Sequence, residues 1–175
     1  MKAAAAGTLS VLTPVAESEV EALRDDLASL PEGAESPLAR VAGTHIARWS
    51  VVPCLHGKDE HEIDATAYLL FTSWFDGPAE AYPEALLAGM AAEAHAIWRH
   101  CSGYPGIWNA LAFRRYLLDH RLTPGLALGG YPGATVDEVL SALELRESIA
   151  AFAVDSQGMG ANQLRNAWQE RFPLP

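Results

Sequence analysis

Two segments rich in β-branched and aromatic residues, 43–52 and 67–75, constrain the fold more than any other part of the sequence. The segment between them is polar, so the pair is predicted to form an antiparallel hairpin. Neither segment alternates cleanly between apolar and polar residues, which indicates that both faces of the hairpin are covered. Because buried polar groups need partners, the hairpin is also the predicted wall of a pocket or an interface. Its interrupting polar residues are His45, Arg48, Ser50, Thr72 and Ser73.

Helices and two more strands are predicted around this hairpin. Residues 8–12 are typical of a short first strand, and Thr13-Pro14 then has the pattern of a helix start, with Thr as N-cap and Pro in the first turn. The apolar spacing predicts that this helix runs to residue 30. Further helices are predicted from Pro78 to the Gly103 terminator and over 109–121, 135–153 and 157–171, with a fourth strand over 126–131.

The order strand–helix–strand–strand–helix–strand is that of a ferredoxin-like α+β sandwich, βαββαβ. One extra helix follows the second core helix, and two are appended at the C-terminal end. The length of 175 residues favours a single domain over 1–175. Such a sheet carries its helices on one face, so its other face is predicted to be buried by a second copy, giving a homodimer.

Charge and composition exclude several classes of function. The net charge of −10 argues against sequence-independent binding to nucleic acid or to an anionic membrane. No apolar run is long enough for a membrane-spanning helix or a signal peptide, so a cytoplasmic protein is expected. The two cysteines form neither a disulfide framework nor a metal-ligand spacing. The phosphate-binding loop, the dinucleotide fingerprint, His-Glu-x-x-His and Gly-x-Ser-x-Gly are all missing from the sequence.

Five stretches of the chain resemble a family of uncharacterised bacterial proteins with a ferredoxin-like fold: 9–14, 43–49, 70–77, 97–105 and 131–136. Some members are sequence-linked to peroxidase-like neighbours. More broadly, the layout is similar to the dimeric α+β-barrel group, which includes cofactor-free oxygenases, polyketide cyclases, chlorite-dismutase-like haem proteins and dye-decolourising peroxidases. The aspartate-containing distal motif of these peroxidases is not visible in this sequence. The resemblance implies small-molecule chemistry without choosing the reaction.

His45 and Arg48 are the predicted catalytic residues. A histidine in a pocket poor in water serves as a general base or as an axial haem ligand. An arginine there holds an anionic substrate or an enolate. In a regular strand the two side chains point to opposite faces. His45 would then share its face with Ala47, Trp49 and Val51. The alternative is that both are structural, with His45 hydrogen-bonded and Arg48 ion-paired.

The remaining candidate residues come from the hairpin and from the turns and helices after it. The polar loop 53–64 holds two histidines among four carboxylates, a composition that suits a divalent metal, but a solvated loop is the preferred interpretation. His100 is predicted to cap a helix C-terminus, or to bind haem if haem is present. The predicted substrate-binding residues are Trp49, Tyr68, Thr72, Trp74, Tyr104, Arg114 and Tyr131.

The leading functional hypothesis is therefore a homodimeric small-molecule enzyme of the α+β-barrel type. It would oxygenate, cyclise or rearrange a hydrophobic, natural-product-like substrate in a pocket between the sheet and its helices, without a required cofactor. One alternative is a haem-binding, peroxidase-like protein, with His45 or His100 as the ligand. The other is a non-catalytic dimeric partner or ligand carrier, which a filled interior would favour.

Overall fold

The computed structural model describes residues 6–53, 67–123, 125 and 133–173. These residues form two compact units, Met1–Val136 and Asp137–Pro175, which we call unit 1 and unit 2 and describe separately. The assignment of residues 1–175 to a single domain stays a prediction.

Unit 1 is built on a four-stranded sheet in the order β2-β3-β1-β4, in which every neighbouring pair is antiparallel. The predicted hairpin is confirmed as the β2–β3 pair, and the α+β class is confirmed with it. The strands are β1 (Ala6–Val15), β2 (Thr44–Val52), β3 (Ala67–Asp76) and β4 (Arg121–Leu122).

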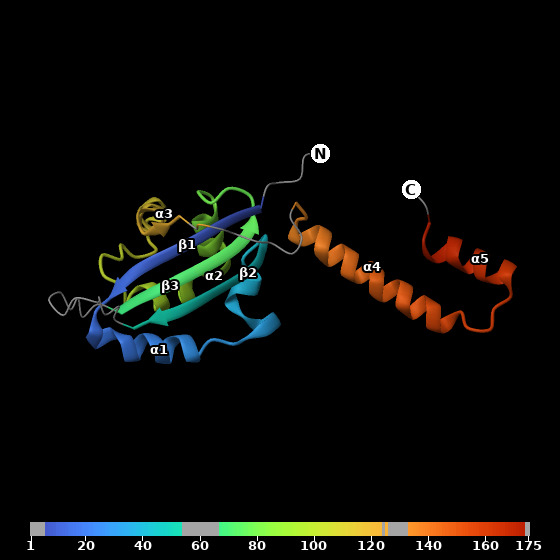
Figure 1. Cartoon of the computed structure of the whole chain (residues 1–175), viewed down its shortest axis with the longest axis horizontal. Helices are drawn as coiled ribbons and strands as arrows, with labels where there is room; N and C mark the ends of the chain where they lie inside the picture. Colours follow the sequence, from blue (N-terminus) through green and yellow to red (C-terminus); the bar gives the residue numbers. More distant parts are fainter. Residues whose placement is uncertain (1–5, 54–66, 124, 126–132, 174–175) are drawn as a thin grey trace. The chain divides into compact units, whose positions relative to one another are not determined.

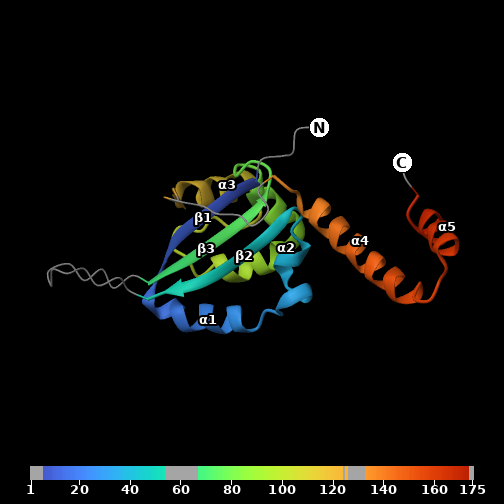
Figure 2. The same ribbon diagram turned by 45° about the vertical axis from the view of Figure 1, so that its right-hand side comes forward.

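The helices of unit 1 cover one face of this sheet. The α-helices are α1 (Val20–Ala28), α2 (Tyr82–Trp98) and α3 (Ala110–Asp119), and the 3-10 turns are η1 (Glu17–Glu19), η2 (Gly33–Glu35) and η3 (Pro37–Arg40). Figures 1 and 2 show α2 behind the sheet and no helix of unit 1 in front of it. We call the side without helices the open face.

Strict alternation along β1 and β3 separates the core from the open face. Leu69, Phe71, Ser73 and Phe75 are buried, whereas the alternate residues Leu70, Thr72 and Trp74 are only half-buried. Trp98 of α2 meets Phe71 edge-on at 5.4 Å between ring centroids and Phe113 at 5.5 Å. Aromatic rings therefore fill the layer between the sheet and the helices, as close packing of a protein interior requires.

The predicted helix start at Thr13-Pro14 is wrong, because β1 continues to Val15 and α1 begins only at Val20. The fully buried Thr13 hydroxyl lies 3.4 Å from the Leu69 carbonyl oxygen and 3.2 Å from the Cys101 Sγ. The Pro14 carbonyl accepts a hydrogen bond from the backbone N–H of Ser102 at 2.8 Å. These long-range contacts stabilise an extended backbone over the local helix-start signal.

The structure has a short strand, β4, that the sequence did not predict. β4 lies at the end of the predicted helix 109–121, and its two residues pair with Ser10 and Val11 of β1. The helix there, α3, ends at Asp119. The strand predicted over 126–131 lies outside the described residues.

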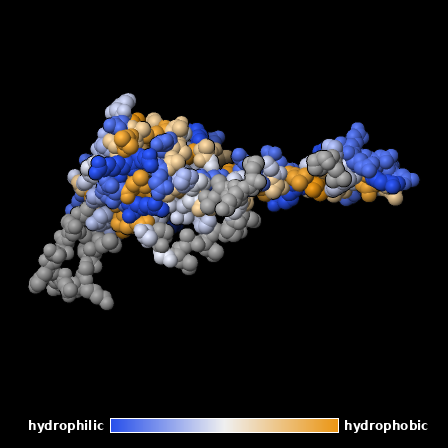
Figure 3. Space-filling model, turned by 90° about the horizontal axis from the view of Figure 1, so that it is seen from above, coloured by the Kyte–Doolittle hydropathy of each residue, from blue (hydrophilic) through white to orange (hydrophobic). Residues whose placement is uncertain are grey.

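Unit 2 contains two helices, α4 (Val136–Asp155) and α5 (Ala161–Arg171), close to the two predicted there. Neither helix has a buried residue, and apolar side chains gather on the surface of α4 (Figure 3). An aromatic cluster of Phe152, Trp168 and Phe172 joins the two helices. No helix in the described ranges of the chain combines the length and apolarity that crossing a membrane requires.

Candidate functional site on the open face

A β-bulge at His45 decides which side chains meet on the open face. Thr44 pairs with Phe75 and Ile46 pairs with Trp74, so His45 is one extra residue in β2. The bulge turns His45 toward Asp76, on the same side of the sheet as Ile46 and Arg48. The expectation that His45 and Arg48 point to opposite faces holds for a regular strand, and the bulge removes that condition. Ala47, Trp49 and Val51, expected beside His45, pack against the core instead.

His45 and Asp76 form a half-buried hydrogen-bonded pair. The His45 Nε2 lies 2.9 Å from the Asp76 Oδ1, and each side chain is 20% exposed. The other carboxylate oxygen, Oδ2, accepts a hydrogen bond from the backbone N–H of Val136 at 2.9 Å. Since the carboxylate accepts the proton of Nε2, the neutral ring keeps its lone pair on Nδ1. This arrangement orients an imidazole for proton transfer.

Asp76 is a candidate site residue that the sequence analysis does not identify, because an aspartate before Gly77-Pro78 is an ordinary turn signal. Its backbone N–H donates to the Gly43 carbonyl at 2.8 Å, beside the bulge. An acidic residue paired across a hairpin from a histidine is the signal that would have identified it.

Arg48 lies on the open face, on the rim of a surface pocket of about 240 Å³. Its Nε donates to the Thr72 Oγ1 at 3.2 Å. Ile46 and Trp74 supply the apolar part of the pocket, and Ser73 completes the lining. The pocket thus combines one cation, two hydroxyl-bearing residues and an apolar wall.

The predicted substrate-binding residues do not gather in one place. Thr72 and Trp74 line the open-face pocket, and Tyr68 lies further along the same face, opposite Val52. Trp49 is on the core side, where it contacts Phe71 and Trp98. Its buried indole N–H has no hydrogen-bond partner among the described residues.

Tyr104 and Arg114 are also remote from the pocket. The Tyr104 ring packs against Phe113 and Tyr116, and burial raises the pKa of its hydroxyl to about 12. Arg114 lies 3.7 Å from a carboxylate oxygen of Glu84. Tyr131 lies outside the described residues.

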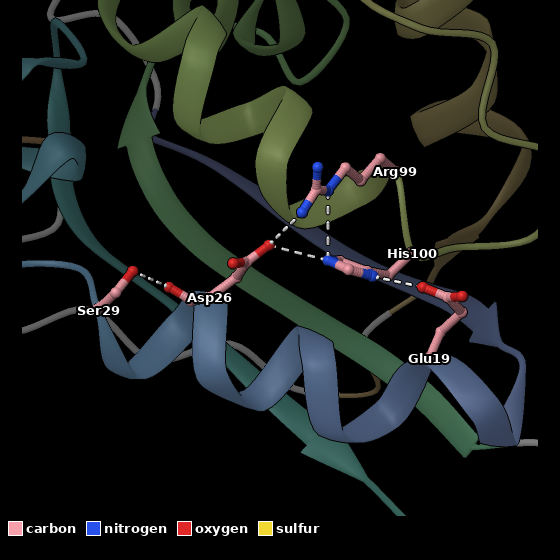
Figure 4. Close-up of polar contacts among 5 residues, drawn as sticks. All are labelled: Glu19, Asp26, Ser29, Arg99 and His100. Carbon is pink, nitrogen blue, oxygen red and sulfur yellow. Dashed lines mark hydrogen bonds and ion pairs between the residues drawn. The ribbon is translucent and has the colours of Figure 1, made fainter.

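His100 belongs to a separate ionic cluster on the helix side of unit 1 (Figure 4). Its buried ring lies between two carboxylates, with Nδ1 2.8 Å from the Glu19 Oε2 and Nε2 2.9 Å from the Asp26 Oδ2. Arg99 Nη2 donates to the same Asp26 oxygen at 3.0 Å. The hydrogen bond from His100 is the main cause that lowers the pKa of Asp26. His100 therefore connects the end of α2 to η1 and α1 through side-chain hydrogen bonds. This role differs from the predicted helix cap.

Of the two predicted haem ligands, His100 does not fit haem ligation, whereas His45 keeps the lone pair of Nδ1. Both ring nitrogens of His100 face carboxylates, and the Nε2 of His45 is held by Asp76. In the described part of the chain, no group of three or more His, Cys, Asp or Glu residues is arranged to hold a metal ion. The polar loop 53–64 lies outside the described residues.

Comparisons with family models, with curated proteins and with solved structures find no match to this chain. The resemblance to bacterial ferredoxin-like proteins and the activities that it implies therefore stay predictions.

Proposed function

We propose that this protein is a small-molecule enzyme in which His45, oriented by Asp76, transfers protons on the open face of the sheet. The observation that carries the proposal is the His45–Asp76 pair, in which a carboxylate holds Nε2 and leaves Nδ1 as the basic nitrogen. In such a pair the carboxylate also stabilises the imidazolium that forms when the base takes up a proton.

The chemistry that suits this pair is proton abstraction next to a carbonyl group. The proton moves from carbon to the Nδ1 of His45, and the electron pair of the broken C–H bond moves onto the carbonyl oxygen as an enolate. Return of the proton to another atom completes a rearrangement or cyclisation without an external oxidant. Arg48 supplies positive charge on the same face, and Ile46 and Trp74 supply apolar contact.

The same proposal includes a ferredoxin-like fold and a homodimer. The strand order β2-β3-β1-β4 supports the fold, with α1 between β1 and β2 in the chain and α2 and α3 between β3 and β4. Apolar residues on the open face support the dimer, since Leu12 pairs with Leu70 there and neither is covered by a helix of unit 1. A second copy on this face would bury them and enclose the pocket.

A non-catalytic ligand carrier or dimeric partner is the second candidate. The filled aromatic layer between the sheet and the helices favours it, because the substrate pocket first expected there has no space among Phe71, Trp98 and Phe113. In this alternative the open face binds a molecule without transferring a proton.

Deuterium exchange into an enolisable probe separates the two candidates. The wild-type protein is expected to accelerate exchange at C3 of phenylpyruvate in D₂O, followed by NMR, and His45→Gln is expected to abolish the acceleration. His95→Gln is the matched control, because His95 contacts Tyr104 on the helix side of the sheet. Equal rates for wild type and His45→Gln would remove the catalytic proposal.

A further inference from the structure

We infer that the open-face pocket selects small molecules that carry a carboxylate on an apolar body, with Arg48 as the residue that binds the carboxylate. This inference rests on the proposed function only for its biological meaning, since ligand binding is measured without any reaction. It assigns a ligand class to a pocket whose shape alone would accept any small apolar molecule.

The first observation is the pairing of arginines in unit 1. Six of its seven described arginines lie within ion-pair distance of a carboxylate: Arg24, Arg40, Arg99, Arg114, Arg115 and Arg121. Arg48 alone has no carboxylate partner among the described residues, although the chain carries a net charge of −10. A guanidinium without an acid in such an acidic protein is available for an anion from outside.

The second observation is how the Arg48 side chain is held. Its Nε donates to the Thr72 hydroxyl at 3.2 Å, directly across the β2–β3 pair. This neutral hydrogen bond restrains the guanidinium without cancelling its charge. The terminal nitrogens, Nη1 and Nη2, have no partner in the described ranges of the chain, and their spacing matches the two oxygens of a carboxylate.

The third observation is the apolar surface beside the cation. Ile46, on the edge strand β2, is 66% exposed, and Trp74 of β3 lies directly across from it. The pocket of about 240 Å³ corresponds to about eight water molecules at ~30 Å³ each. That space suits a ring or a short alkyl chain attached to the carboxylate, and it is small for a large cofactor.

The inference is tested by comparing two ligands of the same shape. 3-Phenylpropanoate and 3-phenylpropan-1-ol are titrated into the full chain at low salt, with isothermal calorimetry and NMR shift mapping as readouts. The acid is expected to bind at least tenfold more tightly than the alcohol, with the largest shifts at Ile46, Thr72 and the Trp74 indole. Arg48→Met is expected to remove this preference, and Arg48→Lys to restore part of it.

Arg24→Met is the matched control, because it removes an exposed arginine from α1 and should leave the preference unchanged. Thr72→Val provides a second variant, which keeps the charge of Arg48 but removes the hydrogen bond that holds its guanidinium. This variant should bind 3-phenylpropanoate severalfold more weakly than the wild type. Equal binding of acid and alcohol, or an acid preference that survives in Arg48→Met, would overturn the inference. His45→Gln should bind the acid normally, so unchanged exchange activity in this variant, with acid binding retained, would end the catalytic proposal alone.

Discussion

One extra residue in β2 determines the chemistry of the open face. Without the bulge at His45, the histidine would alternate with Arg48 and point into the packed aromatic layer. With the bulge, it reaches the Asp76 carboxylate on the same face as Arg48. Gly43 makes this possible, because its φ of +72° is a conformation that other residues adopt only with strain.

Replacing Gly43 with alanine is expected to destabilise the fold by about 1–2 kcal/mol from the left-handed backbone conformation alone. A Cβ there would also lie 3.2 Å from the Cβ of Asp76, so a further loss is expected. Urea denaturation measures the sum of these two losses in the free energy of unfolding. Gly33→Ala is the control, since Gly33 has a φ of +66° but no neighbour within 4 Å of an added Cβ. If both variants lose the same stability, contact with Asp76 does not matter at this position.

Cys101 is expected to be inert in the folded protein. Burial raises the pKa of its thiol to about 11, so almost no thiolate is present at pH 8. In a Cys54→Ser background, labelling of Cys101 with a thiol reagent at pH 8 should proceed at the rate of unfolding and become fast in urea. Rapid labelling under native conditions would contradict the buried position of this side chain.

The pKa of Asp26, lowered chiefly by its hydrogen bond with His100, predicts a pH-dependent contribution to stability. A carboxyl whose folded pKa is below its unfolded value stabilises the fold above the unfolded value, near 3.8 here. That contribution is lost as the pH falls through the folded pKa. Asp26→Asn should therefore cost about 1 kcal/mol at pH 7, and the difference from wild type should shrink below about pH 4.

Chemical denaturation at pH 7, 5 and 3 measures this dependence. Asp25→Asn is the control, because it removes a neighbouring exposed acid on α1, whereas the carboxylates that contact His100 are those of Glu19 and Asp26. A constant difference between wild type and Asp26→Asn across this range would show that the ionised carboxylate is not what stabilises the cluster.

At the scale of elements, α2 and η3 approach each other closely in unit 1. The Arg40 Nε donates to the Gly89 carbonyl at 3.1 Å, and its guanidinium pairs with Glu93 one turn later. Met90, which follows Gly89, has non-helical φ and ψ of −155° and 44°, so α2 is kinked at its contact with Arg40. A glycine here permits a backbone approach that no other residue would allow.

Gly89→Ala is accordingly expected to destabilise the protein, although glycine-to-alanine changes inside helices normally stabilise by about 1 kcal/mol. An added Cβ would lie 2.8 Å from the Arg40 carbonyl oxygen, a backbone atom that moves only with η3. Thermal unfolding measures the sign of the change. Ala92→Gly, at an exposed position of the same helix, is the control and reports helix propensity alone. If Gly89→Ala is more stable than the wild type, η3 is not held at this contact.

At the scale of the molecule, unit 1 has one face buried under helices and one face without them, on which Leu12, Leu70 and Ile46 lie among polar side chains. The proposed homodimer makes use of this second face. Leu70→Glu would place a charge at its centre, between Leu12 and Ser50 on the neighbouring strands, and leave the core side of β3 unchanged. Burying that charge in an interface is unfavourable, so the dimer dissociation constant should rise more than tenfold.

Sedimentation equilibrium is the measurement for this prediction. The wild-type protein should sediment as a dimer and Leu70→Glu as a monomer with an unchanged circular dichroism spectrum. Ala22→Glu, on an exposed position of α1, is the control and should stay dimeric. A monomeric wild-type protein would remove the dimer from the proposal while leaving the ligand test for Arg48 in place.

Local patterns in the sequence were enough to predict the α+β class, the β2–β3 hairpin and the helices α4 and α5. These elements follow from hydrophobic periodicity, turn residues and helix caps, which act between residues near each other in the chain. The same reasoning identified His45, Arg48 and Thr72 as polar interruptions of an apolar hairpin and Trp74 as a candidate substrate-binding residue, and the structure brings all four to the open face.

Long-range contacts decided the rest. The bulge that joins His45 to Asp76, the extension of β1 through Thr13 and Pro14, and the burial of Trp49 and Tyr104 each depend on partners far along the chain. Local preference amounts to a few tenths of a kcal/mol to about 1 kcal/mol per residue, which a buried hydrogen bond or a packed ring readily exceeds. The sequence by itself therefore determined which elements form, and tertiary packing decided which of their side chains meet.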